Sequence, residues 1–300
     1  MPNCVKNACT KFNHAAPIIP EHSPHPWNIP QYGAKQQKSD PIVKTPLSPT
    51  DKLWVQQVIG TFLYYARAID PTMLTAMNSI AAGQTTDGIK SLKKRIAQFL
   101  NYAATHPDAK IKYVASAMHL WSHSDASYLC ESKARSRAGG VAFLSEQPKF
   151  PILPDDPPPA PNHAVIVICK ILDAVMSSAQ ESETGAGFVT ARELVPARIT
   201  LNELGHAQGP TPLQFDNQCA KGILTDEIKQ KCSKAMDMRF YWLRDRVRQG
   251  QFKIHWKLGA CNDADYVTKH HPSKHHIAIR HKYVANNTTN LTKTIQKGLD

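Results

Sequence analysis

Short β-forming runs alternate with longer segments of helical periodicity from about residue 118 to residue 256. The expected strands are 118–124, 140–144, 164–169, 212–215 and 251–256, and the expected helices are 179–204, 217–225 and 233–249. Helices that alternate with strands pack as layers on a sheet, so we expect an α/β fold. Pro196 lies inside the first helix and is expected to kink or split it, because proline lacks an N–H and its ring clashes with the preceding turn.

Before these strands, apolar residues at helical spacing predict a unit of three helices over residues 50–110. Ser48 or Thr50 can cap the first helix, since both side chains accept hydrogen bonds from free backbone N–H groups. The second helix is expected over 72–82, and the third ends near residue 106. The sheet domain is then expected over residues 115–285.

Three segments lack a periodic apolar pattern. Residues 1–49 are rich in Pro, His, Asn and Gln, which predicts a disordered segment or a linker. Within the expected sheet domain, 115–285, residues 146–163 carry three consecutive prolines and predict a surface loop. Residues 286–300 are expected to form a tail.

Composition limits the classes of protein to consider. The 36 basic and 24 acidic residues give a net charge of +12, which favours a polyanionic partner such as a nucleic acid. No apolar run approaches the roughly 18 residues that cross a bilayer, so no membrane partner is expected. The seven cysteines form no CxxC pair, which predicts reduced thiols inside the cell without distinguishing the cytoplasm from the nucleus.

Four carboxylates lie at or near the ends of expected elements. Asp125 ends the first strand, Asp216 ends the fourth, Glu183 lies in the first turns of the long helix, and Asp265 follows the last strand. If the two strands are neighbours, Asp125 and Asp216 meet at one edge of the sheet. Clustered oxygens suit hard cations, and two Mg²⁺ ions about 3.5 to 4 Å apart can activate water and stabilise the leaving oxygen of a phosphodiester. Taken singly, each acid is more often a solvated surface group or a helix cap.

Five motifs occur in the order seen in the ribonuclease H domain of copia-type retrotransposon polyproteins. They are Ser124–Tyr128, Ala134–Gly140, Ser177–Glu183, Phe215–Asn217 and Asn262–Lys269. Upstream, Val58–Ala66 and the following Asp70-Pro71 resemble the segment that joins the reverse transcriptase to that domain. The resemblance covers about residues 50–285.

This resemblance implies an RNase H-like fold, in which a mixed five-stranded sheet is flanked by helices, here preceded by the three-helix unit. The metal-binding acids of the family match Asp125, Glu183, Asp216 and Asp265. Glu181 competes with Glu183, but the two point about 200° apart around a helix, so only one can face the cleft. We prefer Glu183, because in the family pattern the second Glu precedes small and apolar positions.

The implied function is hydrolysis of the RNA strand of RNA/DNA hybrids with two Mg²⁺ ions, for which Mn²⁺ can substitute. The polymerase motif Tyr/Phe-x-Asp-Asp is missing, since the pair Asp155-Asp156 lies in the proline-rich loop, so no polymerase activity is expected. The chain resembles a fragment of a polyprotein, with the polymerase region as a candidate partner. The alternative is a catalytically inactive, nucleic-acid-binding remnant, and a DNA phosphodiesterase of the same fold is a third hypothesis.

Candidate contacts to the nucleic acid are basic or polar residues close to the matching motifs. They are Arg135, Arg137, Asn217, Arg239 and Lys269. The histidines 270, 271, 275 and 276 have no cysteine or carboxylate partner, so we expect them to end the fold as a polar, basic segment and not to bind zinc.

Overall fold

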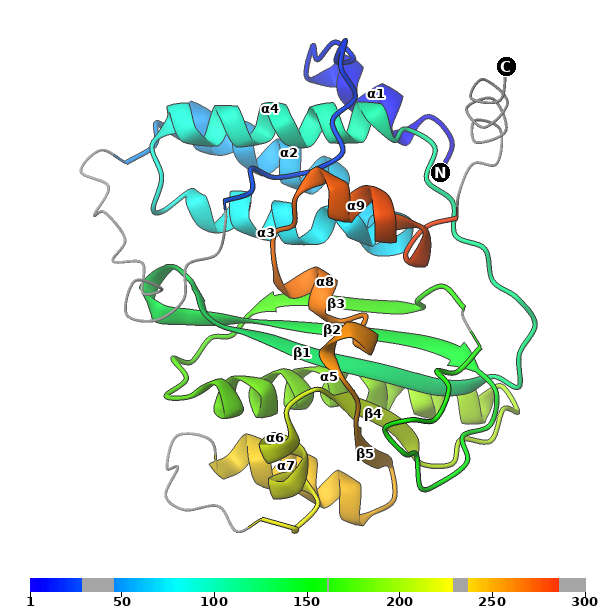
Figure 1. The fold of residues 1–300 in the computed structure, drawn as a ribbon. Helices are drawn as coiled ribbons and strands as arrows, with labels where there is room; N and C mark the ends of the chain where they lie inside the picture. The colour runs from blue at the N-terminus through cyan, green and yellow to red at the C-terminus, as the bar shows by residue number, and fades with distance from the viewer. Residues whose placement is uncertain (29–45, 161, 229–236, 286–300) are drawn as a thin grey trace, which may run out of the picture.

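A five-stranded sheet divides the molecule into two helical layers (Figure 1). The computed structural model describes residues 1–28, 46–160, 162–228 and 237–285. The strands are β1 (His119–Glu131), β2 (Arg135–Ser145), β3 (Ile166–Ile171), β4 (Thr211–Phe215) and β5 (Phe252–Trp256). Their order is β3-β2-β1-β4-β5, with β1, β2 and β3 antiparallel and β4 and β5 parallel to β1. This mixed sheet between helices confirms the RNase H-like fold expected from the sequence.

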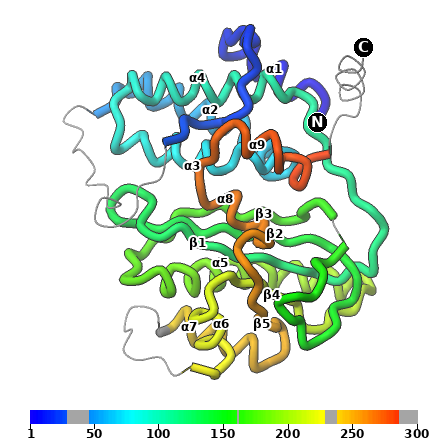
Figure 2. Tube along the Cα trace, in the orientation of Figure 1, coloured from blue at the N-terminus to red at the C-terminus, as the bar shows by residue number. Residues whose placement is uncertain are grey.

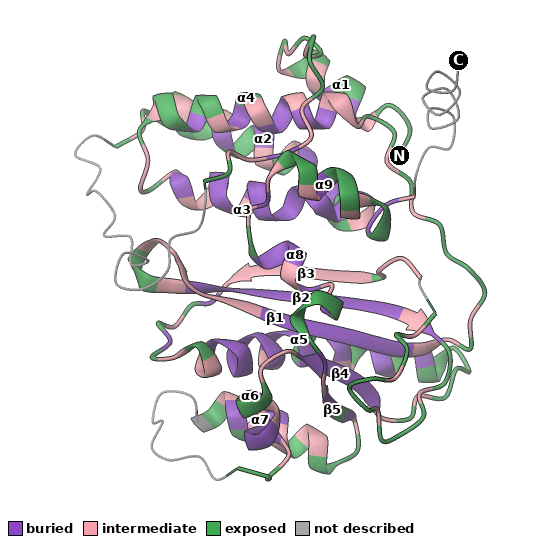
Figure 3. Cartoon of the chain, in the orientation of Figure 1, coloured by how far each residue is buried: buried purple, intermediate pink, exposed green. Residues whose placement is uncertain are grey.

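Small residues at the centre of β2 let helices approach the sheet from both sides. A side chain at Gly139 would meet the Ala264 carbonyl oxygen at 2.8 Å, and one at Gly140 would meet Thr190 Oγ1 at 2.5 Å. The edge strand β3 is only half-buried, whereas β2 and β4 are almost fully buried (Figure 3). One flank of β3 therefore remains open to the surface.

The first layer contains the expected three-helix unit. Its helices are α2 (Pro49–Ala68), α3 (Leu74–Gly83) and α4 (Ile89–Thr105), with a short 3₁₀ turn, η2 (Pro71–Met73), before α3. Ser48 caps α2, because its side chain accepts a hydrogen bond from Asp51 N at 3.1 Å. The apolar faces of the three helices share one core that includes Val58, Ile80 and Phe99.

Residues 1–28 are part of this layer, so the expectation of a disordered segment or linker is wrong there. Helix α1 (Cys4–Lys11) buries Val5 and Ala8 on one face and packs on α2 and α4. Farther along, Glu21 N donates to Thr105 Oγ1 at 2.9 Å. Two small apolar residues three positions apart suffice to seat this short helix, a pattern too weak to recognise in a polar segment. Residues 29–45 lie outside the described part of the chain.

The second layer contains α5 (Ala179–Glu203), α6 (Gln218–Leu224) and α7 (Asp237–Arg248). Helix α5 packs on β1 and β2. It continues through Pro196, so the expected split is absent; Leu194 and Leu201, on either side of the proline, are both buried and hold the helix on the core. The expected start of α7 at residue 233 falls in 229–236, outside the described residues.

After β5 the chain crosses from the sheet back to the first layer, a path that the tube in Figure 2 makes visible. It forms α8 (Asp265–Thr268), α9 (Ser273–Ile279) and the 3₁₀ turn η5 (Arg280–Lys282). The expected polar, basic segment is instead packed: His276 is 5% exposed, and its Nδ1 lies 2.6 Å from the Tyr266 hydroxyl. The sequence did not predict these helices, because their burial depends on partners far away in the chain.

The segment 146–160 that follows β2 contains no helix or strand, in keeping with the expected proline-rich loop. No helix among the described residues is long and apolar enough to cross a bilayer. The described cysteines are free thiols. The expected tail, 286–300, lies outside the described residues.

Candidate metal centre

Two carboxylates face each other across the junction of β1 and β4. The parallel register pairs Ser122 with Leu213 and His123 with Gln214. Asp125 lies three residues after Ser122, and Asp216 lies three residues after Leu213, directly past the end of β4. The two carboxylates therefore lie opposite each other at the same end of the sheet. Asp125 does not end β1 as expected, because β1 continues to Glu131 along β2; only its pairing with β4 stops.

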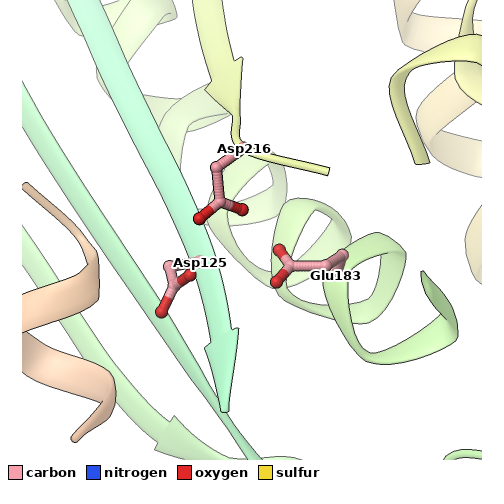
Figure 4. A group of neighbouring side chains, drawn as sticks. All are labelled: Asp125, Glu183 and Asp216. Atoms are coloured by element: carbon pink, nitrogen blue, oxygen red, sulfur yellow. The ribbon is translucent and has the colours of Figure 1, made fainter. Parts of the chain in front are cut away.

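Helix α5 supplies a third carboxylate. Glu183 lies in its second turn, and one oxygen each of Asp125, Glu183 and Asp216 lie within 4.8 Å of one another (Figure 4). Glu183 Oε1 also accepts a hydrogen bond from Ala126 N at 3.3 Å. The sheet and the helix thus bring together three of the four acids predicted from the sequence.

Glu181 has a different role at the start of α5. Its backbone N donates to Ser178 Oγ at 3.1 Å, and its carboxylate accepts from Ser177 N at 2.8 Å. These two bonds form a variant of the capping box, in which the carboxylate returns to Ser177, the residue before the N-cap Ser178. Glu183, and not Glu181, therefore points toward Asp125 and Asp216.

Burial and mutual repulsion make it hard to ionise all three acids together. The pKa of Asp125 is raised to about 6, mainly by burial; the charge of Lys269 opposes this increase, and the carboxylates of Asp265 and Asp216 contribute to it. Burial and the nearby carboxylates of Asp125 and Asp216 raise the pKa of Glu183 well above its usual value. Burial also raises the pKa of Asp216. A positive charge between the carboxylates would relieve this repulsion.

The donor set fits a hard divalent cation. All three groups offer carboxylate oxygens, the ligand type that Mg²⁺ prefers. Glu183 Oε2 is buried and has no hydrogen-bond partner, so one lone-pair site in the cluster is unused. An unpaired buried acceptor of this kind is costly unless a cation or water binds it.

Asp265 and Lys269 form an ion pair beside the cluster. Asp265 lies at the start of α8, and its Oδ1 accepts from Lys269 Nζ one helical turn later. Asp265 is close enough to raise the pKa of both Asp125 and Asp216. Burial alone would lower the pKa of Lys269, but the carboxylates around it raise it. The ammonium group therefore neutralises part of the charge of the cluster.

Several residues position these acids, and the sequence did not single them out. The Thr268 hydroxyl donates to Asp125 Oδ2. Asn262 Nδ2 donates to Ser124 O at 2.8 Å, and Trp256 Nε1 donates to Asp216 O at 2.8 Å. Asn262 and Thr268 lie within one of the recognised motifs, which is the only sequence signal that points to them.

The five candidate nucleic-acid contacts are spread over the molecule. Arg135 is half-buried at the start of β2, and Asn217 Oδ1 caps α6 by accepting from Ala220 N at 3.0 Å. Lys269 lies at the acidic cluster, and Arg239 lies in a groove on α7.

Arg137 is wrong as a nucleic-acid contact, because its side chain is only 1% exposed. It forms an ion pair with Glu131 and donates to Thr75 O at 3.2 Å and to Ser79 Oγ at 2.9 Å. Arg137 thus connects the sheet to α3, a structural role that its position in a motif did not reveal.

No family model matches the sequence, and no curated protein matches it. Solved structures with related folds include the N-terminal RNase H domain of a Mycobacterium tuberculosis protein, with 12% identity, a TM-score of 0.34, and coverage of 50% of this chain and 91% of that chain. RNase H1 LC11, isolated from compost, matches with 10% identity, a TM-score of 0.35, and coverage of 50% and 91%. A foamy viral protease–reverse transcriptase in complex with double-stranded DNA matches with 11% identity, a TM-score of 0.39, and coverage of 70% and 35%. Because these TM-scores are low, the fold is assigned from the strand order and the placement of α5, and not from the similarity to these structures.

Proposed function

We propose that the protein is a metal-dependent endoribonuclease that hydrolyses the RNA strand of RNA/DNA hybrids, and that it derives from a copia-type retrotransposon polyprotein. The observation that carries the proposal is the cluster of Asp125, Glu183 and Asp216, whose oxygens lie within 4.8 Å of one another at one end of a mixed sheet. The motif order along the chain supports the choice of substrate. The polymerase region of such a polyprotein is a candidate partner.

The cofactor we propose is Mg²⁺, as two ions, with Mn²⁺ as a substitute. Asp125, Glu183 and Asp216 are the proposed ligands, and Asp265 is the proposed fourth. Bound divalent cations supply an activated water and stabilise the leaving oxygen of the phosphodiester. Support comes from the raised pKa values of the three clustered acids and from the unpartnered oxygen of Glu183.

The residues of the chain bind and position the reactants. Asp125 and Asp216 come from adjacent strands, so their separation is fixed by the sheet, and Glu183 is fixed by its helix. Thr268 orients the Asp125 carboxylate through its hydroxyl group. Lys269, Arg135 and Asn217 are proposed to contact the backbone of the hybrid. Recognition through phosphates and 2′-hydroxyls predicts binding that depends on shape and salt and not on sequence.

The test is cleavage of an end-labelled RNA/DNA hybrid by the purified full chain with Mg²⁺ or Mn²⁺. We expect cuts in the RNA strand that disappear with EDTA and in Asp216→Asn. Glu203→Gln is the matched control, because Glu203 is an exposed carboxylate at the far end of the helix that carries Glu183. This variant should cleave as the wild type does.

Double-stranded RNA and double-stranded DNA serve as comparison substrates. Cleavage of DNA duplexes at the same rate as hybrids would favour a DNA phosphodiesterase instead. Binding of the hybrid without cleavage under either metal would contradict the enzyme proposal and leave a catalytically inactive, nucleic-acid-binding remnant.

A further inference from the structure

A groove of about 370 Å³ is lined by residues of β3, of the segment that follows β3, of α5 and of α7. Two aromatic and three cationic side chains line it: Phe188, Trp242, Lys170, Arg192 and Arg239. Among the described residues that line it, Asp173 is the one carboxylate. The groove is therefore aromatic and positively charged.

This groove is separate from the acidic cluster. At roughly 100° per residue, Phe188 and Arg192 lie about 140° and 180° around α5 from Glu183, so they face away from it. Arg239 and Trp242 come from α7, which contributes no side chain to the cluster. A ligand in the groove would not contact the three acids.

An arginine side chain lies over each of the two aromatic rings. Phe188 and Trp242 pack edge to face, with ring centroids 5.3 Å apart. The Arg192 guanidinium lies 5.8 Å from the centre of the Phe188 ring, and that of Arg246 lies 5.2 Å from the centre of the Trp242 ring. Aromatic rings and guanidinium planes are both surfaces on which unpaired bases stack.

The cations of the groove are available to a phosphate. Lys170 pairs with Asp173 at 3.3 Å and Arg192 with Glu193 at 3.2 Å, but all four side chains are at least 44% exposed. Exposed pairs of this kind contribute little energy, so a phosphate can replace the carboxylate. For Arg239, the described part of the chain shows no ion pair at all.

We propose that this groove binds single-stranded DNA, with bases stacked on Phe188 and Trp242 and phosphates bound by Lys170, Arg192 and Arg239. A single strand is favoured over a duplex because bases must be unpaired to stack on side chains. We assign the strand as DNA because stacking on Phe188 and Trp242 and binding of phosphates by the cations need no 2′-hydroxyl, and oligo(rU) is the comparison ligand. The proposal does not rest on the catalytic activity of the acidic cluster.

The test measures binding of fluorescein-labelled oligo(dT) of about 12 nucleotides to the full chain in EDTA, where no metal-dependent cleavage occurs. We expect Trp242→Ala to weaken binding at least about fivefold, the loss that one stacked base predicts. Tyr241→Ala is the matched control, because Tyr241 is an exposed aromatic on the same helix outside the groove. It should bind as the wild type does.

Three further variants, one of them a control, guard against an effect of misfolding. The double variant Arg192→Gln/Arg239→Gln should lower the slope of log affinity against log salt concentration by about 0.7 for each lost phosphate contact. The control Lys274→Gln, on the opposite helical layer, should leave this slope unchanged. Trp242→Phe keeps an aromatic ring but lacks the indole, so it should lose the quenching of tryptophan fluorescence that oligo(dT) causes in the wild type. Unchanged affinity and salt slope in the groove variants would overturn the proposal, as would tighter binding of oligo(rU) than of oligo(dT).

Discussion

At the scale of single residues, the site separates two glutamates that lie two positions apart. Glu181 closes a capping box at the start of α5, and Glu183 reaches the carboxylates of β1 and β4. Helical periodicity predicts that only one of them faces the sheet, but it does not say which. The choice follows from where Ser178 starts the helix, which the structure shows directly.

Glutamine variants should separate the two roles. Glu181→Gln retains an acceptor for the capping box, so stability and cleavage should match the wild type. Glu183→Gln should abolish cleavage of the hybrid. It should also raise the unfolding free energy in EDTA near pH 8, because burial raises the pKa of Glu183 and ionisation is therefore unfavourable in the folded protein. Urea unfolding checks this, and a less stable Glu183→Gln protein would contradict it.

Thr268 is expected to position Asp125. Thr268 is 2% exposed; its hydroxyl donates to Asp125 Oδ2, and its methyl group packs against Gly139. Thr268→Val keeps the shape but removes the donor, so we expect weaker Mn²⁺ binding by calorimetry and cleavage reduced about tenfold or more, from loss of a hydrogen bond to a charged group. Thr268→Ser should restore both properties. Equal Mn²⁺ affinity in the Val variant and the wild type would contradict this role.

At the scale of elements, local pattern predicted the five strands, α2 to α6 and the approximate extent of α7, because each has its own apolar periodicity. It did not predict the length of the first hairpin, since the residues after Asp125 show no regular alternation of apolar and polar side chains and their register with β2 shifts between Ser127 and Glu131. It also did not predict α9, whose residues are mostly polar. Arg137 was misplaced for a related reason: a basic residue in a motif is expected at the surface, and only the docking of α3 buries it.

The histidines of α9 and the preceding loop should make stability depend on pH. Burial, and then repulsion from neighbouring histidines, lowers the pKa of His271 to about 4 and that of His276 to about 3. Both are neutral in the folded protein, whereas the unfolded chain takes up protons below about pH 6.5. The unfolding free energy should therefore be highest above that pH and fall toward pH 4, by up to about 1.4 kcal/mol per pH unit for each histidine.

Urea unfolding between about pH 7.5 and pH 5 measures this slope. The double variant His271→Gln/His276→Gln should start from a lower stability, because it loses the contact of His276 with Tyr266, but its stability should fall less steeply with acid. Other buried histidines, such as His106 and His255, account for the slope that remains. An identical slope in the double variant and the wild type would contradict the assignment.

At the scale of the whole molecule, the sheet and the first helical layer are joined by buried polar contacts. Asn78 Nδ2 donates to Cys169 O at 2.6 Å, and Thr75 Oγ1 donates to Val267 O at 3.0 Å. After α9, the chain contacts the segment that follows α4, where Ala285 N donates to Lys110 O at 2.7 Å. The segment around α8, which carries the proposed fourth ligand Asp265, is thus held from both sides, by β2 and by α3.

One buried ion pair tests whether the two parts unfold together. Arg280 NH2 donates to Asp70 Oδ2 at 2.6 Å across 210 positions of sequence, and Asp70 is fully buried. Arg280→Ala leaves that carboxylate without its cation, so we expect a loss of about 3 to 5 kcal/mol in unfolding free energy. Lys93→Ala breaks an exposed pair with Asp51 and should lose less than about 1 kcal/mol. Tyr283, directly after η5, donates to Asp263 O, two residues before α8, at 2.6 Å. Cleavage by Arg280→Ala should therefore decline at a lower temperature than in the wild type, in step with unfolding followed by circular dichroism. Loss of the helical signal at a temperature where cleavage persists would show instead that the sheet and its acids hold their geometry without the first layer.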